Sequence, residues 1–179
     1  MEPKAPLAHC DECPLADQPF VPGDGPDQTE IVIVGEAPGK IEVLERKPFV
    51  GQAGCLLNQE LSSSNIHRSS VHVTNAVLCR PERNKKPSVH AIRACHDRLI
   101  REIELSGARK VLALGETATH AVARDSRPIS KLREADHVPS PYFGDGVSVR
   151  VTYHPSWVWR NWEEGYPPFA SDIRRLLDP

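Results

Sequence analysis

Four short segments of this chain carry side chains that can act together on a small polar ligand. They are segment 35–39 (Gly-Glu-Ala-Pro-Gly), segment 48–51 (Pro-Phe-Val-Gly), Thr74-Asn75 and His154-Pro155-Ser156. Glu36 and His154 bring a carboxylate and an imidazole, which transfer protons and stabilise charge at reacting bonds. Phe49 offers a flat ring, and Asn75 offers an amide that presents both a donor and an acceptor. The set predicts a pocket that holds a flat, polar ring and cleaves a bond to it.

Four of the five cysteines form a second group that favours metal binding: Cys10, Cys13, Cys79 and Cys95. The close spacing of the first two lets both thiolates bind one metal centre, but the wide separation of the other two is not typical of a zinc ribbon. Four thiolates suit tetrahedral zinc or an iron–sulfur cluster, and ligand softness does not separate the two. We interpret Cys55, at the start of a predicted helix, as a small apolar residue rather than a ligand.

The elements expected to position these side chains alternate between strand and helix. Apolar runs predict strands at 31–34, 71–74, 111–114 and 147–152, and caps and periodicity predict helices at 52–61, 89–105, 116–123 and 169–177. This alternation is typical of an α/β fold, here a three-layer α/β/α sandwich with a central, mostly parallel four-stranded sheet. Glu36, Asn75 and His154 each lie at or just past a predicted strand end. Because ligands bind beyond the carboxyl ends of such strands, we expect these side chains to meet at one edge.

Length and composition limit the classes of protein that fit. A chain of 179 residues suits one domain, which we place at 1–179 with a cysteine-bearing arm at 1–28. A net charge of −2 argues mildly against a protein whose main task is to grip phosphates, although local basic patches remain. With no signal-like segment and no apolar run of about 20 residues, we expect a cytoplasmic protein that does not associate with a membrane. In a reducing compartment, cysteines favour metal binding over disulfides.

The motifs of this chain, taken in order, resemble those of the family-4 uracil-DNA glycosylases, the branch with an iron–sulfur cluster. They are Gly35-Glu-Ala-Pro-Gly39, Pro48-Phe-Val-Gly51 with Ala53-Gly54, Thr74-Asn75, Cys79-Arg-Pro81, Leu114-Gly115 with Thr117-Ala118, and Tyr153-His-Pro-Ser156. The resemblance runs from Cys10 to about Arg160. It implies an enzyme that flips uracil out of single- or double-stranded DNA, hydrolyses its N-glycosidic bond and leaves an abasic site for base excision repair. We expect a monofunctional enzyme that acts as a monomer.

The resemblance implies a role for each pocket residue. Glu36 faces the sugar, where it activates water or stabilises the cation-like sugar. Phe49 is a stacking platform, and Gly35 lets the backbone approach the base closely. Asn75 reads the O4 and N3–H edge of uracil and rejects cytosine, whose edge has the opposite polarity. His154 donates a hydrogen bond to uracil O2 as negative charge builds there.

The resemblance also implies a cofactor and a loop that contacts DNA. Cys10, Cys13, Cys79 and Cys95 fall where the family's four ligands to a structural 4Fe–4S cluster would fall. The segment after His154 resembles the one that enters the helix where the base has left; its residues are Ser156, Trp157, Val158, Trp159 and Arg160. Two tryptophans beside an arginine can wedge between bases and hold a phosphate. The alternative is that these rings pack in the core with Trp162 and Tyr166.

Several positions depart from the family pattern. Glu42 is followed by Val43 where an acidic pair is usual, and the other departures are Arg46-Lys47, Leu78, Glu82 and Glu134. They lie in loops expected near DNA, so they bear on substrate range and DNA affinity more than on the chemistry. No basic insertion follows the Phe49 loop, which argues against covalent trapping of uracil.

Two other functions stay open at this point. The first alternative is a non-catalytic module of the same fold that binds uracil or DNA. The second is a cysteine-rich metalloprotein with a redox or scaffold role. The presence of Glu36, Asn75 and His154 together favours the enzyme, because a decayed pocket would be expected to lose at least one of them.

Overall fold

The computed structural model describes residues 3–178, and within them the strands form one four-stranded sheet in which every pairing is parallel. The strands are β1 (Ile31–Gly35), β2 (His72–Asn75), β3 (Lys110–Leu114) and β4 (Ser148–Thr152), in the order β2-β1-β3-β4. Every residue of β1 is buried, as expected for an apolar run covered on both faces. The predicted sheet is confirmed.

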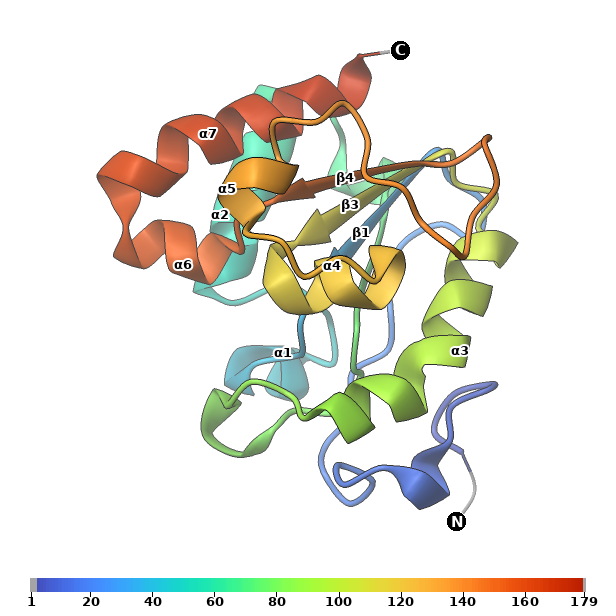
Figure 1. Cartoon of the computed structure of the whole chain (residues 1–179). Coiled ribbons are helices and arrows are strands. Elements are labelled where there is room, and N and C mark those ends of the chain that lie inside the picture. The colour runs from blue at the N-terminus through green and yellow to red at the C-terminus, as the bar shows by residue number, and fades with distance from the viewer. Residues whose placement is uncertain (1–2, 179) are drawn as a thin grey trace.

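Helices cover both faces of the sheet, so the three-layer sandwich is also confirmed (Figure 1). They are α1 (Lys40–Glu45), α2 (Gln52–Ser63), α3 (Val89–Leu105), α4 (Gly115–Ala123), α5 (Ile129–Leu132), α6 (Pro155–Arg160) and α7 (Trp162–Arg174). In β1, Val32 and Val34 pack with α3, α4 and α5, whereas Ile31 and Ile33 pack with α2, α6 and α7. This alternation follows from the two-residue period of a strand.

The strand order creates a crevice between β1 and β3. From β1 the chain moves outward to β2, and it then returns to β3 on the other side of β1. The loops that follow β1 and β3 therefore diverge at the carboxyl edge of the sheet, which is where parallel sheets bind ligands. Glu36 follows β1, and Gly115 follows β3. Gly115 has a φ of +82°, a backbone conformation that is strained for any residue with a side chain.

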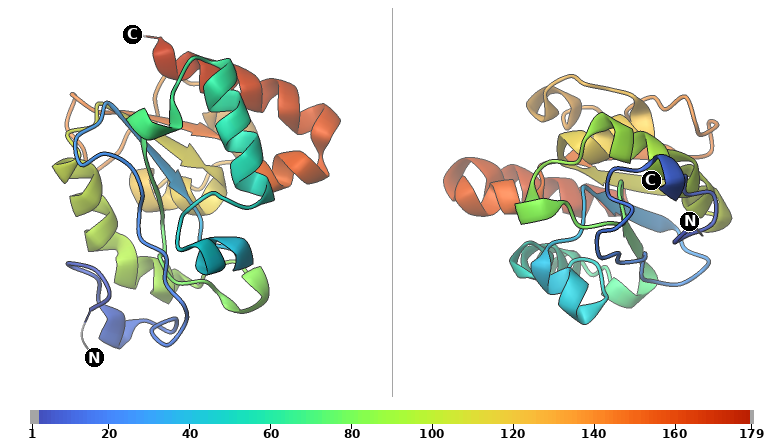
Figure 2. Two further views of the ribbon diagram at one scale, coloured as in Figure 1. Left: turned by 180° about the vertical axis from the view of Figure 1, so that it is seen from behind. Right: turned by 90° about the horizontal axis from the view of Figure 1, so that it is seen from below.

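The N-terminal arm first lies beside α3 and then runs along the outer edge of β2 (Figure 2). Asp24 forms an antiparallel bridge with Val73, and Phe20 forms one with Cys79. The His9 N–H donates to the Ala94 carbonyl of α3 at 2.9 Å. The arm thus covers a sheet edge that would otherwise expose unpaired backbone groups. None of the helices within residues 3–178 is long and apolar enough to cross a bilayer.

The last helix differs from its prediction. It begins at Trp162 rather than at 169, and Pro167 and Pro168 lie inside it. Proline is unfavourable inside a helix because it lacks an N–H and crowds the preceding turn. Here packing overrides that preference: Gly165 lets the turn before the prolines lie against α6, where an added Cβ would come within 2.8 Å of the Trp157 ring. The short helices α1, α5 and α6 were not predicted.

Candidate active site

A cavity of about 440 Å³ lies at the carboxyl edge of the sheet and brings the four predicted pocket side chains together. Glu36, Phe49, Asn75 and His154 all line it, although they come from distant parts of the chain. The other lining residues that the chemistry uses are Gly39, Glu42, Gly51, Lys85, Ser156 and Arg160. The prediction that strand ends would assemble one site is therefore confirmed geometrically.

The Glu36 carboxylate is held from the far side of the crevice. Thr117, in the first turn of α4, donates a hydrogen bond from its hydroxyl to Glu36 Oε2 at 2.5 Å. Thr117 is buried, whereas Glu36 is partly exposed at the cavity. A charge-assisted hydrogen bond of this kind restricts the carboxylate to one orientation.

Gly35 allows an aromatic ring and an amide to meet at the end of β1. A Cβ added to Gly35 would lie 2.4 Å from Phe49 Cζ and 2.5 Å from Asn75 Oδ1. Phe49 itself has a φ of +55°, which is uncommon for a bulky residue and turns its ring into the site. Its ring centroid lies 6.1 Å from that of His154. Phe49 also belongs to the apolar core around α2, so its position is set by packing.

The imidazole of His154 is held in one tautomer. Its Nδ1 accepts a hydrogen bond from the Ser156 N–H at 3.2 Å and lies 2.7 Å from Ser156 Oγ. Because Nδ1 accepts a hydrogen bond, it carries no proton in the neutral ring, and the ring proton lies on Nε2. Burial lowers the pKa of His154 from 6.5 to about 4, and the positive charge of Arg160 acts in the same direction, opposed by Glu42. The ring is therefore a neutral donor at ordinary pH.

Glu42 joins the two loops of the pocket. One carboxylate oxygen accepts from the Gly39 N–H at 3.1 Å, and the other accepts from the Gly51 N–H at 2.8 Å. The sequence interpretation treated Glu42 only as half of an incomplete acidic pair. The signal that could have found its role is its position three residues after a helix N-cap, as in a capping box.

The segment after His154 divides between core and surface. Trp157 stacks on Tyr153 with centroids 4.4 Å apart, and Val158 is fully buried in the core. Trp159 is 43% exposed and donates from Nε1 to the Gln52 carbonyl at the rim of the cavity. Ser156 and Arg160 line the cavity, Trp159 is exposed and Trp157 is partly buried, whereas Val158 does not reach the surface.

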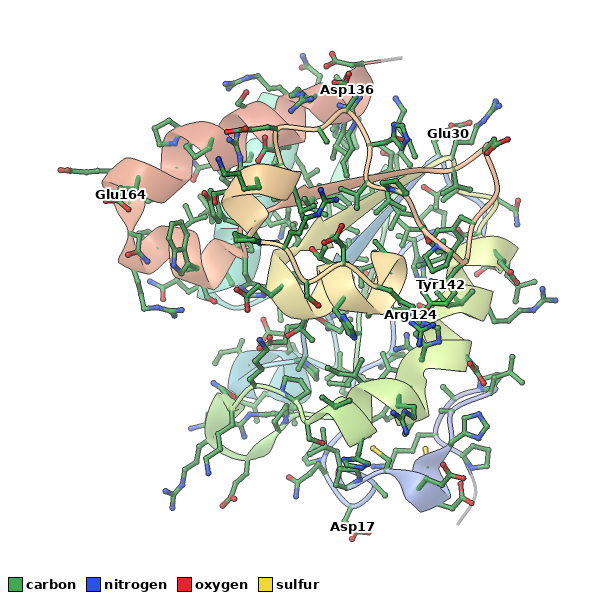
Figure 3. The ribbon with its side chains drawn as sticks, in the orientation of Figure 1. Asp17, Glu30, Arg124, Asp136, Tyr142 and Glu164 are labelled. Atoms are coloured by element: carbon green, nitrogen blue, oxygen red, sulfur yellow. The ribbon has the colours of Figure 1, made fainter. Side chains whose placement is uncertain are left out.

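Exposed rings continue along α7 beyond Trp159. Trp162 lies 5.3 Å from Trp159 and stacks on Tyr166 at 4.3 Å. Core packing is therefore the right description for Trp157 but not for Trp159. The labelled Glu164 projects outward where α6 meets α7 (Figure 3), so this surface also carries negative charge.

The four predicted ligand cysteines gather between the arm and α3. Sulfur atoms, drawn in yellow in Figure 3, are visible beside the N-terminal arm and α3. Burial raises the pKa of Cys79 to about 11; nearby Lys4 opposes the shift, and Cys95, Cys13 and Cys10 add to it. The Lys4 ammonium lies 3.7 Å from Cys79 Sγ, and the Lys4 N–H lies 3.4 Å from Cys10 Sγ.

This cysteine group fits a thiolate-bound centre in its donor types. All four are free thiols, three of them buried, whereas Cys55 is exposed. Within residues 3–178, however, no three such side chains are arranged closely enough to form a metal site. Four soft thiolate donors suit tetrahedral zinc or an iron–sulfur cluster.

Comparison with known proteins agrees with this geometry. Residues 22–177 match the uracil DNA glycosylase superfamily. The type-4 uracil-DNA glycosylase of Pyrobaculum aerophilum is 36% identical over 97% of this chain and 94% of its own length. The type-4 enzyme of Thermotoga maritima is 38% identical over 94% of this chain and 83% of its own length. The type-4 enzyme of Archaeoglobus fulgidus is 35% identical over 85% of this chain and 79% of its own length. With its parallel sheet, its pocket and these relatives, the chain belongs to the type-4 branch of the uracil-DNA glycosylase superfamily.

Proposed function

We propose that this chain is a uracil-DNA glycosylase that flips uracil out of DNA and hydrolyses its N-glycosidic bond, leaving an abasic site. The observation that carries the proposal is the convergence of Glu36, Phe49, Asn75 and His154 in one cavity. A ring, an amide, a neutral imidazole and a carboxylate are the groups that recognition and cleavage of a flipped base require. Its action would initiate base excision repair.

Recognition of the base rests on Phe49 and Asn75. Phe49 provides a stacking face, worth about 1–3 kcal/mol per base. Asn75 lies beside it at the end of β2, where its amide pairs with the O4 and N3–H edge of uracil. Cytosine presents the opposite polarity and would leave buried polar groups unpaired, which disfavours its binding.

Cleavage rests on His154 and Glu36. As the bond breaks, the electron pair moves onto uracil, and the Nε2–H of neutral His154 donates to the developing anion at O2. Removal of one such donor typically lowers the rate by about 10²–10³-fold. Glu36, held by Thr117, faces the sugar and activates water or stabilises the cation-like carbon. Water supplies the hydroxyl group of the abasic site, and uracil leaves with a proton.

The DNA backbone would meet the rim of the cavity. Lys85 and Arg160 line it and can bind phosphates on either side of the flipped nucleotide. We expect Trp159, which is exposed at this rim, to enter the space that the base leaves. The substrate is uracil-containing DNA, single- or double-stranded, and we expect the protein to act on it as a monomer.

We further propose that Cys10, Cys13, Cys79 and Cys95 hold a 4Fe–4S cluster. Such a cluster supplies no step of the hydrolysis; its four thiolate ligands would tie the arm to the loop after β2 and to α3. Reduced cysteines and a DNA substrate suit the cytoplasm.

The proposed function is tested by excision from a labelled oligonucleotide that carries one uracil, followed by alkaline cleavage. The protein is purified without oxygen, and its iron content is measured. We expect strand cleavage by the wild type, a loss of about 100-fold or more in His154→Ala, and unchanged activity in His67→Ala, which alters an exposed histidine. Cleavage by none of the three proteins, at full iron content, would exclude the enzyme and favour a binding module.

A further inference from the structure

A buried arginine of α3 holds the strand end that carries Asn75. Arg98 is 4% exposed, and its Nη2 donates to the carbonyl oxygens of Asn75 at 2.8 Å and Ala76 at 3.1 Å. Its Nη1 donates to Thr74 Oγ1 at 3.2 Å and to Glu102 Oε2 at 2.6 Å. The planar guanidinium thereby fixes two successive carbonyls relative to each other, which a flexible ammonium does not do.

Charge balance alone does not explain these carbonyl contacts. Glu102 already neutralises Arg98, and its other oxygen lies 2.7 Å from His72 Nε2. Thr74 completes the network by donating to Glu102 at 3.2 Å. A buried ion pair is costly to assemble and needs its remaining polar atoms satisfied. The two carbonyls of the strand end satisfy Nη2 and are held by it in turn, whereas Nε has no hydrogen-bond partner within the described residues.

The same peptide groups connect Asn75 to Glu36. The Ala76 N–H donates to the Gly35 carbonyl at 2.8 Å, and the Val77 N–H donates to the Glu36 carbonyl at 3.1 Å. A shift of the strand end would therefore displace both the amide and the carboxylate of the pocket. Asn75 has little free space, since its Oδ1 would lie within 2.5 Å of any Cβ at Gly35.

We propose that Arg98 is a positioning residue for base recognition: by holding the Asn75 and Ala76 carbonyls, it sets the orientation of the Asn75 amide in the pocket. Arg98 does not line the cavity, so it acts through Asn75 rather than on the base. This role rests on the proposed function of Asn75. Because Cys95 lies one turn before Arg98 on α3, the same helix joins the cysteine group to the pocket.

The test compares two substitutions that alter different halves of the network. Arg98→Lys keeps the charge beside Glu102 but cannot bridge both carbonyls, whereas Glu102→Gln keeps the bridge and removes the counter-charge. Arg68→Lys is the matched control, because Arg68 bonds the Val71 carbonyl at the opposite end of the same strand. For each protein we would measure single-turnover excision, binding to uracil-free DNA, iron content, and amide hydrogen exchange at Ala76 and Val77.

We expect Arg98→Lys to slow excision by about tenfold or more, since displacing a group by about 1 Å can reduce a rate about 100-fold. Exchange at Ala76 and Val77 should accelerate, while exchange in β3, binding to uracil-free DNA and iron content stay unchanged. Glu102→Gln and Arg68→Lys should remain close to the wild type in excision. Equal losses in Arg98→Lys and Glu102→Gln, or an unchanged rate and exchange in Arg98→Lys, would overturn the proposal.

The design separates failure of this inference from failure of the proposed function. If the wild type excises no uracil, the proposed function fails, while exchange at Ala76 and Val77 still reports whether Arg98 holds the strand end. If Arg98→Lys does not fold, the double variant Arg98→Gln/Glu102→Gln removes both charges together and leaves no buried carboxylate unpaired. That variant should show the same acceleration of exchange and the same slow excision; wild-type values in both would overturn the proposal.

Discussion

Thr117 donates a hydrogen bond to the Glu36 carboxylate at 2.5 Å and so connects the first turn of α4 to the loop after β1. The two residues are 81 positions apart in the chain and meet only because β1 and β3 are neighbours in the sheet. The threonine is buried, and the carboxylate reaches the cavity. A residue outside the cavity thus orients a residue inside it.

Thr117→Val should therefore slow excision without weakening DNA binding. The side chain keeps its volume but loses the hydroxyl, so Glu36 can rotate away from the sugar; we expect a fall in kcat of about tenfold or more. Thr117→Ser should restore most of the rate. The control is Thr119→Val, because Thr119 is buried in the same helix but donates to the Gly115 carbonyl instead. Equal losses in the two valine variants would mean that the helix, not Glu36, is affected.

Gly35→Ala should abolish base recognition while the sheet still forms. The new methyl group would overlap Phe49 Cζ and Asn75 Oδ1, so the ring and the amide must move apart. We expect excision to fall by about 100-fold, as for a displacement of about 1 Å at a reacting site. Single-turnover kinetics check this, with Gly144→Ala as control because its Cβ would contact nothing within 4 Å. Wild-type activity in Gly35→Ala would contradict the packing described here.

His154 should make the protein less stable in acid. Its pKa is about 4 in the folded protein and 6.5 otherwise, so between these values the unfolded chain binds a proton that the folded one does not. Stability is therefore fully retained above pH 6.5 and falls as the pH drops toward 4, by up to about 3 kcal/mol. Urea unfolding at pH 7 and pH 4.5 measures the loss. In His154→Gln, whose side chain does not titrate, the free energy of unfolding should differ less between the two pH values. A difference equal to that of the wild type would show that His154 is not the cause of the acid destabilisation.

The same pKa predicts the pH dependence of activity. Because His154 stays neutral down to about pH 4, the rate of excision should not fall through pH 6.5, where an exposed histidine would become charged. A pH–rate profile of single-turnover excision tests this. A decline centred near pH 6.5 in the wild type would show that His154 is not in the buried, neutral state described here.

Removal of the proposed cluster should free the arm before it unfolds the sheet. Chelation of iron after mild oxidation would break the ties between Cys10, Cys13 and the rest of the group, whereas the bridges of Asp24 and Phe20 to the strand edge persist. Limited proteolysis should then cut within the first 20 or so residues, where exposed chain is most accessible. Cys79→Ser should behave in the same way, and Cys55→Ser, altered at an exposed thiol, should not. If the chelated protein, Cys79→Ser and Cys55→Ser all resist proteolysis equally, a cluster has no role in holding the arm.

Trp159 and Trp157 should have opposite effects when truncated. Trp159→Ala removes an exposed ring at the cavity rim, so Kd for uracil-containing DNA should rise roughly tenfold with little change in stability. Trp157→Ala removes a ring stacked on Tyr153 and should cost about 3 kcal/mol of stability. DNA binding and urea unfolding of both variants distinguish the two. If the two variants are equally stable and Trp157→Ala loses more DNA binding, then Trp157 rather than Trp159 contacts the DNA.

Much of the fold could be predicted from local patterns. The run Ile31-Val32-Ile33-Val34 before a glycine identified a buried strand, and Ser88 marked the start of α3, where its hydroxyl accepts from Ala91 N as a cap. The predicted start of α7 was wrong: Pro167 and Pro168 are unfavourable inside a helix, yet the helix continues through them and packs against α6 at Gly165.

The sequence by itself determined which side chains would meet. Glu36, Asn75 and His154 each lie at a strand end, and parallel strands bring their carboxyl ends to one edge whatever the details of packing. The residue types then limited the chemistry that the site can perform.

Only the tertiary structure decided how those side chains are held. The contacts of Thr117 with Glu36 and of Arg98 with Asn75 join positions with no local relation in sequence. Packing also separates partly buried Trp157 from exposed Trp159. The low pKa of His154 likewise comes from burial, which depends on every element that surrounds the ring. Periodicity and spacing describe one element at a time, whereas orientation and desolvation arise where several elements pack together.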